Sequence, residues 1–277
     1  MTDPHYNLHF DQHVTVQSLC DLVLMDSPDA QGQGIILHAR HATPSKKAGM
    51  TDGEYTYISN LALRIGDTVW EFVAEGARLF KDGVQIEIED SFAPLAGAGV
   101  GPYVVNKYVK GQRKNQVYYE FLFIDMSKIV LRSNLHFKMA YIEVGGFSNT
   151  DVTGFLGRTD RKGFFDREGN VMTNVADSND IESYAQEWQV QAEEPKLFME
   201  KDVFPQAPQK CVFVDKKSKD LLRGSRRRLS ENDAKLRVQA TKACGHLDDS
   251  NLKKQWCIDD VVSTGFIDIA SDSFYYE

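Results

Sequence analysis

Apolar and polar residues alternate with a period of two along much of the first 145 residues. The alternation is clear at residues 61–65, 84–88 and 135–141, and this period is typical of strands that bury one face. Between two apolar runs lies Lys81-Asp82-Gly83, which predicts a hairpin because Asp and Gly tolerate the positive backbone angles of a tight turn. Residues 117–124 are apolar on both faces except at Glu120, which predicts a central strand.

Strands at these intervals, with few helical patterns between them, predict a mainly β protein built as an antiparallel sandwich of two sheets. After Trp188 neither the two-residue period of strands nor the helical period is present, and Pro195, Pro205 and Pro208 mark a connector. We therefore place the boundary of the β domain near residue 192.

A helical period begins near the C-terminus. Ser230 is a candidate N-cap, followed by acidic residues in the first turn. A second helix is expected from Asp249-Ser250 to a stop at Gly265. The sequence thus predicts a β domain over residues 1–192, a connector over 193–228 and an α-helical hairpin over 229–277.

Composition and charge limit the classes of partner. The 277 residues include 42% hydrophobic residues, enough for a large buried core. A net charge of -8 argues against nucleic acid as the main partner, because phosphate recognition uses a basic surface. No run of 18 apolar residues occurs, so we expect no membrane span.

Five short strings stand out along the chain: Asp3-Pro4-His5, Phe10-Asp11, Cys20-Asp21-Leu22-Val23-Leu24, Gly154-Phe155-Leu156-Gly157-Arg158-Thr159-Asp160 and Tyr184-Ala185-Gln186-Glu187-Trp188-Gln189-Val190. Together they resemble the fingerprint of the von Willebrand factor type D domain, over residues 3 to 190. Leu22 stands where that family usually has Tyr, and Leu156 replaces the cysteine of its Gly-Leu-Cys-Gly motif. The resemblance implies a β-sandwich from an extracellular protein.

The same resemblance implies a calcium site. Asp11, Asp160 and Asp166 match ligand positions of calcium-binding type D domains, and hard oxygen ligands from distant segments suit this ion. Arg158, however, replaces an Asn ligand, and Phe165 replaces an Asn or Asp. Three interpretations stay open: a calcium site, a salt bridge in which Arg158 substitutes for the ion, or polar loop residues that never converge.

Four cysteines form an even set. Cys244 and Cys257 lie in the two adjacent helical segments, where one disulfide would join a hairpin, and Cys20 and Cys211 are a second candidate pair. Buried reduced thiols are the alternative. The C-terminal segment resembles the small cysteine-bearing helical module that often follows type D domains. No Cys-x-x-Cys pair occurs, so disulfide-linked multimers are not expected.

Histidines suggest two further kinds of chemistry. His5, His9 and His13 recur every fourth residue, as metal ligands on one helix face would. His38-Ala39-Arg40-His41 could supply acid and base groups, but no nucleophile motif accompanies it. We interpret the second string as a strand with two exposed histidines, and we keep a hydrolase that uses N-terminal His and Asp residues as an alternative function.

One dense basic segment interrupts the acidic chain, and it comprises Lys216, Lys217, Lys219, Arg226, Arg227 and Arg228. A solvated linker is the ordinary interpretation of such a run. Binding to anionic polysaccharide or phospholipid headgroups, or cleavage by a basic-specific protease, are alternatives.

These observations predict a non-enzymatic module of a larger secreted or cell-surface protein. Met1-Thr2-Asp3-Pro4 leads directly into the first motif, so we expect any signal peptide to lie outside this sequence. The expected partners are other domains of the parent protein and protein or glycan ligands, with adhesion or matrix assembly as the role. A self-assembling structural protein, using aromatic patches such as Phe274-Tyr275-Tyr276, is an alternative.

Overall fold

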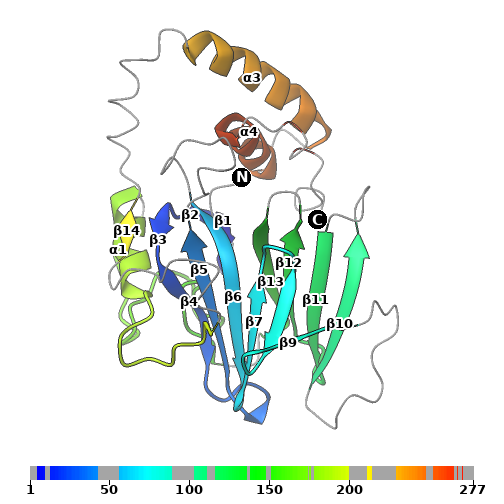
Figure 1. The fold of residues 1–277 in the computed structure, drawn as a ribbon. Helices are drawn as coiled ribbons and strands as arrows, with labels where there is room; N and C mark the ends of the chain where they lie inside the picture. Colours follow the sequence, from blue (N-terminus) through cyan, green and yellow to red (C-terminus); the bar gives the residue numbers. More distant parts are fainter. Residues whose placement is uncertain are drawn as a thin grey trace. The chain divides into compact units, whose positions relative to one another are not determined.

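The computed structural model describes residues 5–9, 13–42, 56–88, 103–110, 116–135, 138–147, 151–173, 175, 178–199, 211–213, 229–247, 252–264, 267 and 270. Over these residues the chain is mainly β, with antiparallel sheets and a C-terminal pair of helices (Figure 1). The predicted fold class is therefore confirmed. The chain divides into two compact units, and the larger one comprises Pro4–Ala42 and Ile58–Val212.

The first sheet of the larger unit has six strands in sequential order, β4-β5-β6-β7-β8-β9. They are β4 (Asp21–Ser27), β5 (Ile35–Ala42), β6 (Tyr57–Ile65), β7 (Thr68–Val73), β8 (Arg78–Lys81) and β9 (Val84–Ile86). The predicted turn joins β8 to β9, where Asp82 and Gly83 both have positive φ. A one-residue irregularity between Val23 and Met25 shifts the register of β4 against β5.

The second sheet has four antiparallel strands, in the order β10-β11-β12-β13. They are β10 (Tyr103–Lys110), β11 (Gln116–Phe123), β12 (Lys128–Asn134) and β13 (Met139–Gly145). Strand β11 is an interior strand, as its two apolar faces predict. The expected strand over 135–141 is wrong in its bounds, because β12 ends at Asn134 and β13 begins only at Met139.

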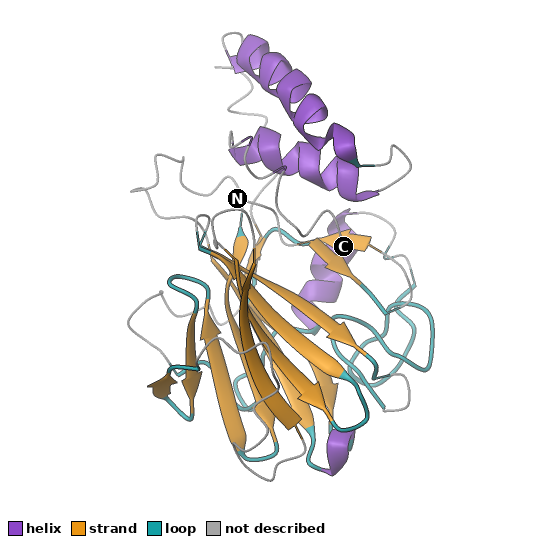
Figure 2. Cartoon of the chain, turned by 90° about the vertical axis from the view of Figure 1, so that its right-hand side faces the viewer, coloured by secondary structure: helices purple, strands orange, loops and turns teal. Residues whose placement is uncertain are grey.

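Aromatic side chains from both sheets meet in the core of the sandwich. The ring of Phe72 lies 5.6 Å from that of Tyr119, and the ring of Trp70 lies 5.2 Å from that of Phe121. The hydroxyls of Tyr119 and Ser133 donate to carbonyl groups that follow β7. Figure 2 shows that strands make up most of the larger unit.

Short elements complete the larger unit. Strands β1 (His5–Asn7) and β2 (His13–Thr15) form a hairpin, and β3 (Ser18–Leu19) pairs with β14 (Val212–Phe213). A 3-10 turn, η1 (Ala30–Gly32), joins β4 to β5. Helix α1 (Ser178–Glu187) was not predicted, although Ile181, Tyr184, Ala185 and Trp188 have helical spacing and are buried.

The helical hairpin belongs to the smaller unit and consists of α3 (Leu229–Ala243), η3 (Cys244–His246) and α4 (Leu252–Thr264). A disulfide between Cys244 and Cys257 joins the two helices. Ala240, Trp256 and Val261 are buried around it. Among the described residues, no helix is both long and apolar enough to cross a lipid bilayer.

Several sequence predictions fall outside the described residues. They concern Asp11, the basic segment from Lys216 to Arg228, most of the connector, the helix stop at Gly265 and the aromatic patch at 274–276. These remain predictions.

Candidate functional site

Two chain segments extend the six-stranded sheet beyond its first strand, β4. Phe155 N–H and Leu156 N–H donate to the carbonyls of Val23 and Leu24, at 2.9 and 3.0 Å. Toward the start of β4, Val23 N–H donates to Trp188 O, and Val190 N–H donates to Asp21 O. We call this arrangement of residues 153–157 and 188–190 against β4 the clasp.

Gly154 makes the clasp sterically feasible. Its φ is +130°, and a Cβ built there would come within 2.5 Å of Leu24 O. A side chain at this position would therefore force the segment off β4. This is the physical reason for the first glycine of the Gly154–Asp160 string.

Aromatic side chains hold the clasp from the other side. The rings of Tyr6 and Phe155 are 5.0 Å apart and edge-to-face, and the Phe155 ring lies 5.1 Å from that of Tyr184. The Tyr184 hydroxyl lies 3.2 and 3.1 Å from the carbonyl oxygens of Gly154 and Phe155, and Trp188 Nε1–H donates to Phe165 O. These contacts explain why Tyr184 and Trp188 are spaced by one helical turn.

The N-terminal segment reaches the same place. His9 N–H donates to Leu156 O at 2.8 Å, and strand β1 carries Tyr6. Residues at the start of the chain, near 155 and near 188 are thus brought together at β4.

Arg158 binds two carboxylates beside the clasp. Its Nε and one terminal nitrogen donate to Asp160 at 2.7 and 3.1 Å, and the same terminal nitrogen lies 3.1 Å from Asp151 Oδ1. Hydrogen bonds from Arg158 hold the pKa of Asp160 below its usual range, and Asp160 raises the pKa of Arg158. Asp151 was not among the predicted site residues, because it lies outside the motif and no local pattern marks it.

Asp166 closes a separate turn and is not among the carboxylates that Arg158 contacts. Its carboxylate accepts hydrogen bonds from Asn170 N–H at 2.7 Å and Asn170 Nδ2 at 3.0 Å. The side chain of Asn170 is the main cause of the lowered pKa of Asp166. Of the predicted calcium ligands, then, Asp160 lies beside Arg158, Asp166 lies in the next turn, and Asp11 is outside the described residues.

The histidines lie in different surroundings from those expected. His38 and His41 are both buried, so the prediction of an exposed pair on β5 is wrong. His41 Nε2 lies 2.5 Å from the Tyr6 hydroxyl, and Nδ1 lies 3.0 Å from the Ser18 hydroxyl. Burial lowers the pKa of each imidazole to about 3.

His5, His9 and His13 do not lie on a single helix or strand. β1 ends at Asn7, β2 begins at His13, and His9 lies between them. No cluster of three or more His, Cys, Asp or Glu side chains suited to a metal ion occurs within the described part of the chain.

A second disulfide closes the region of the clasp. Cys20, directly before β4, forms a disulfide with Cys211, and the two cysteines are 191 positions apart in the sequence. The backbone N–H of Cys211 also donates to the side chain of Gln189 at 2.9 Å. Both cysteine pairs considered from the sequence are therefore present as disulfides.

No family model matches the chain, and no curated protein matches it.

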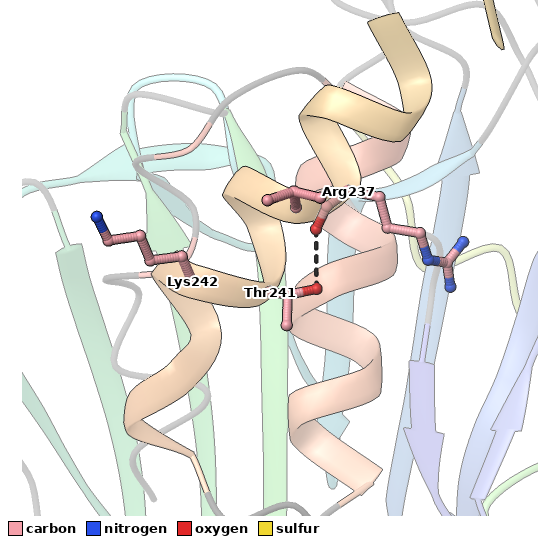
Figure 3. A pocket seen from close by; sticks show the side chains of 4 residues that line it. Arg237, Thr241 and Lys242 are labelled. Atoms are coloured by element: carbon pink, nitrogen blue, oxygen red, sulfur yellow. Dashed lines mark hydrogen bonds between the residues drawn. The ribbon is translucent and has the colours of Figure 1, made fainter. Parts of the chain in front are cut away.

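A separate hollow lies on the helical hairpin. It has a volume of about 570 Å³, and the lining side chains come from α3: Arg237, Val238, Thr241 and Lys242 (Figure 3). The Thr241 hydroxyl donates to Arg237 O, and Arg237 lies 3.5 Å from Asp259 of α4. The hollow is therefore basic at its rim, with Val238 as its exposed apolar element.

Proposed function

We propose that this chain is a non-enzymatic interaction module of a secreted or cell-surface protein, which binds protein or glycan partners in adhesion or matrix assembly. One observation carries the proposal. Three strings of the type D-like pattern, far apart in sequence, meet at β4. The string Cys20–Leu24 forms the first part of this strand, and Phe155, Leu156 and Val190 from the other two strings donate hydrogen bonds to it. Chance strings would have no reason to share one strand.

The disulfides support the extracellular part of the proposal. Cys20–Cys211 and Cys244–Cys257 leave no cysteine free in the chain. Disulfides persist in oxidising compartments and are rare in the cytosol of most organisms. A module with two bridges is therefore suited to the outside of a cell.

We also propose that Arg158 is a built-in cation at the position that an ion occupies in calcium-binding type D domains. The guanidinium contacts Asp151 and Asp160 together, as a divalent ion would, through donors of fixed geometry. Calcium bound by Asp11, Asp160 and Asp166 is the competing proposal.

The proposed function is tested by binding of the folded chain to immobilised ligands. The chain, biotinylated at one terminus, would be passed over panels of glycans and of matrix proteins at 0.15 and 0.5 M salt. We expect saturable binding to at least one ligand, with a Kd of about 10 µM or tighter. Binding that vanishes at the higher salt for every ligand would indicate charge attraction alone.

The matched control is the same chain after reduction and alkylation. Because Cys20–Cys211 closes the region of the clasp, a specific site should lose its ligand when that bridge is cut. The proposal fails if the oxidised chain binds nothing saturably, or if the reduced and alkylated chain binds equally well.

A second function, self-assembly, is favoured by the tip of the β11–β12 hairpin. Ile124 and Met126 are 78% and 71% exposed, and Met126 has a φ of +68°, which is costly for a residue with a Cβ. Asp125 fixes the turn by accepting hydrogen bonds from the N–H and hydroxyl of Ser127. Two apolar side chains are thus held outward on a rigid support.

Light scattering over a concentration series tests self-assembly. If the tip joins copies, the average mass should rise with concentration, and Ile124→Ser with Met126→Ser should abolish the rise. Val84→Ser, at another exposed apolar residue, is the control. A chain that stays monomeric throughout excludes this function.

The hydrolase alternative gains no support from the histidines. His41 is enclosed by Tyr6 and Ser18, and His38 lies beside Phe198, so the two imidazoles do not share one accessible site. Assays with ester, peptide and glycoside substrates would test the alternative directly.

A further inference from the structure

The outer face of the six-stranded sheet is polar, although its residues are buried. Its side chains include His38 and Arg40 on β5, Asn60 on β6 and Glu71 on β7. Asn60 Nδ2 donates to Glu71 Oε1 at 2.9 Å, and Arg40 makes two hydrogen bonds to Asp21. The opposite face of the same strands holds the apolar core. Something must therefore shield this polar face from water.

Residues 195–199 lie across that face. Phe198 packs under the guanidinium of Arg40, with 4.3 Å from Cζ to the ring centroid, and its ring lies 6.4 Å from that of His38. Met199 N–H donates to Glu71 Oε2 at 2.7 Å, and Leu197 is buried. We call residues 195–199 the strap. One backbone hydrogen bond, one cation–π contact and one buried leucine are its principal attachments.

His38 is the group under the strap that is least well accommodated. It is 1% exposed, and its Nδ1 has no hydrogen-bond partner among the described residues. Asn60 Oδ1, on the same face, also lacks a partner within that part of the chain. A buried imidazole with an unsatisfied nitrogen tolerates the neutral form only, because the charged form needs acceptors or water.

The charges around His38 make a proton still less favourable. Arg40 lies on the same strand as His38. The positive charges of Arg64 on β6 and of Arg167 near the clasp both lower the pKa of His38. Lys196 adds an exposed cation on the strap itself.

The neighbouring carboxylates are already engaged. Asp21 is paired with Arg40, and Glu71 accepts from Asn60 and Met199. Glu194 is paired with Arg167, and Asp26 interacts electrostatically with Arg64 and Arg167. Among the described residues, none of these carboxylates forms a hydrogen bond or ion pair with His38. A charged His38 would have to reach water instead.

We propose that the strap is an acid-released cover, and that protonation of His38 opens it and exposes the polar outer face of β5, β6 and β7. Opening gives the imidazolium access to water while leaving the core face of the sheet packed. The device does not depend on which ligand the module binds. Its consequence is a face of Arg40, Asn60 and Glu71 that is covered at neutral pH and uncovered in acid.

The expected size of the effect follows from proton linkage. With the strap closed the pKa of His38 is about 3, and with the strap open it returns to about 6.5. Proton uptake therefore accompanies opening, and the open population rises as pH falls below about 6.5. Between pH 7 and pH 5 the rise is about 25-fold.

Hydrogen exchange measured by mass spectrometry on the full chain tests the proposal. After correction for the intrinsic pH dependence of exchange, amides of 196–199 should open about 25-fold more at pH 5 than at pH 7. At each pH they should exchange faster than the core amides of β6, which open only when the whole unit unfolds. His38→Gln should remove this dependence. His41→Gln is the control, because His41 contacts Tyr6 and Ser18 instead of the strap.

A second measurement covers the case in which His38→Gln does not fold. Phe198→Ala leaves His38 in place but removes the ring beside it and weakens the strap, so the pKa of His38, followed by NMR, should rise from about 3 toward 6.5. The proposal is wrong if the pKa does not move in Phe198→Ala. It is equally wrong if strap amides exchange only together with the core, or if His38→Gln keeps the pH dependence.

Discussion

At the scale of single residues, Arg158 and Gly154 show two ways in which one residue can stabilise the clasp and the loop beside it. Arg158 supplies charge to Asp151 and Asp160, whereas Gly154 contributes by having no side chain near Leu24 O. The first is a matter of electrostatics and the second of space. They therefore respond differently to substitution.

Arg158→Ala should lower the melting temperature modestly, by about 2–4 °C, because its partners are partly exposed and water replaces much of the interaction. Arg158→Lys keeps the charge but loses the two-nitrogen contact with Asp160, so its melting temperature should lie between those of the unaltered chain and Arg158→Ala. If the site resembles a calcium site, added calcium should restore the melting temperature of Arg158→Ala, and a chelator should leave the unaltered chain unchanged. A fall in the melting temperature of the unaltered chain on adding chelator would instead favour bound calcium.

Gly154→Ala should cost about 3 kcal/mol or more of unfolding free energy, since it combines a positive φ with a clash against Leu24 O. Gly169→Ala is the matched control. Its φ is +82°, but nothing lies within 4 Å of the added Cβ, so we expect about 1 kcal/mol. Denaturant unfolding measures both, and equal costs would show that the approach to β4 is not tight.

At the scale of elements, the two disulfides close loops of very different length. Cys20 and Cys211 are separated by 191 residues, and Cys244 and Cys257 by 13. A bridge stabilises mainly by restricting the unfolded chain, and the effect grows with the logarithm of the loop.

Replacing both Cys20 and Cys211 by Ser should therefore cost about 5 kcal/mol, and replacing both Cys244 and Cys257 about 3 kcal/mol. The second change should affect the helical hairpin while leaving the sandwich transition in place, because the two belong to different units. Calorimetry distinguishes the transitions. A single transition lowered equally by either change would contradict this expectation.

Elements also show what the sequence could and could not predict. The β8–β9 turn follows from Asp82 and Gly83 alone, since local backbone preference decides a hairpin. Helix α1 is short, and its helical spacing is carried by only a few buried residues, among them Tyr184 and Ala185, so the periodicity alone did not predict it. The clasp was not predicted, because backbone hydrogen bonds between β4 and residues 155 or 190 leave no periodic trace in the sequence.

The burial of His38 and His41 could not be predicted, for a related reason. An imidazole is compatible with either side of a strand, and the partners that decide the matter come from far away: Tyr6 for His41 and Phe198 for His38. Likewise, Asp151 becomes a partner of Arg158 only when the loop is folded.

At the scale of the whole molecule, stability should fall in acid. The pKa of His41 is about 3 in the folded chain and about 6.5 when unfolded, so unfolding takes up a proton between these values. Stability contributed by neutral His41 is complete above pH 6.5 and decreases as pH falls toward 3. His41 contacts Tyr6 and Ser18 and does not lie under the strap, so we expect it to be protonated only when the chain unfolds.

We expect His41 to contribute a slope of about 1.4 kcal/mol per pH unit below pH 6. Denaturant unfolding at pH 7, 6, 5 and 4 gives the total slope, and His41→Gln should reduce it by about that amount. If the slope is the same with and without the imidazole, other groups govern acid unfolding.

The bond between Cys20 and Cys211 also determines how the chain would carry mechanical load. Tension applied at the two termini passes from Cys20 straight to Cys211, so the 190 residues between them bear none of it. Those residues hold a hidden length of roughly 65 nm at about 3.4 Å per residue. In a single-molecule stretching experiment, the oxidised chain should yield none of this length, and a reductant should release it. A sandwich tied in this way should remain folded under forces that would extend the same chain without the bond.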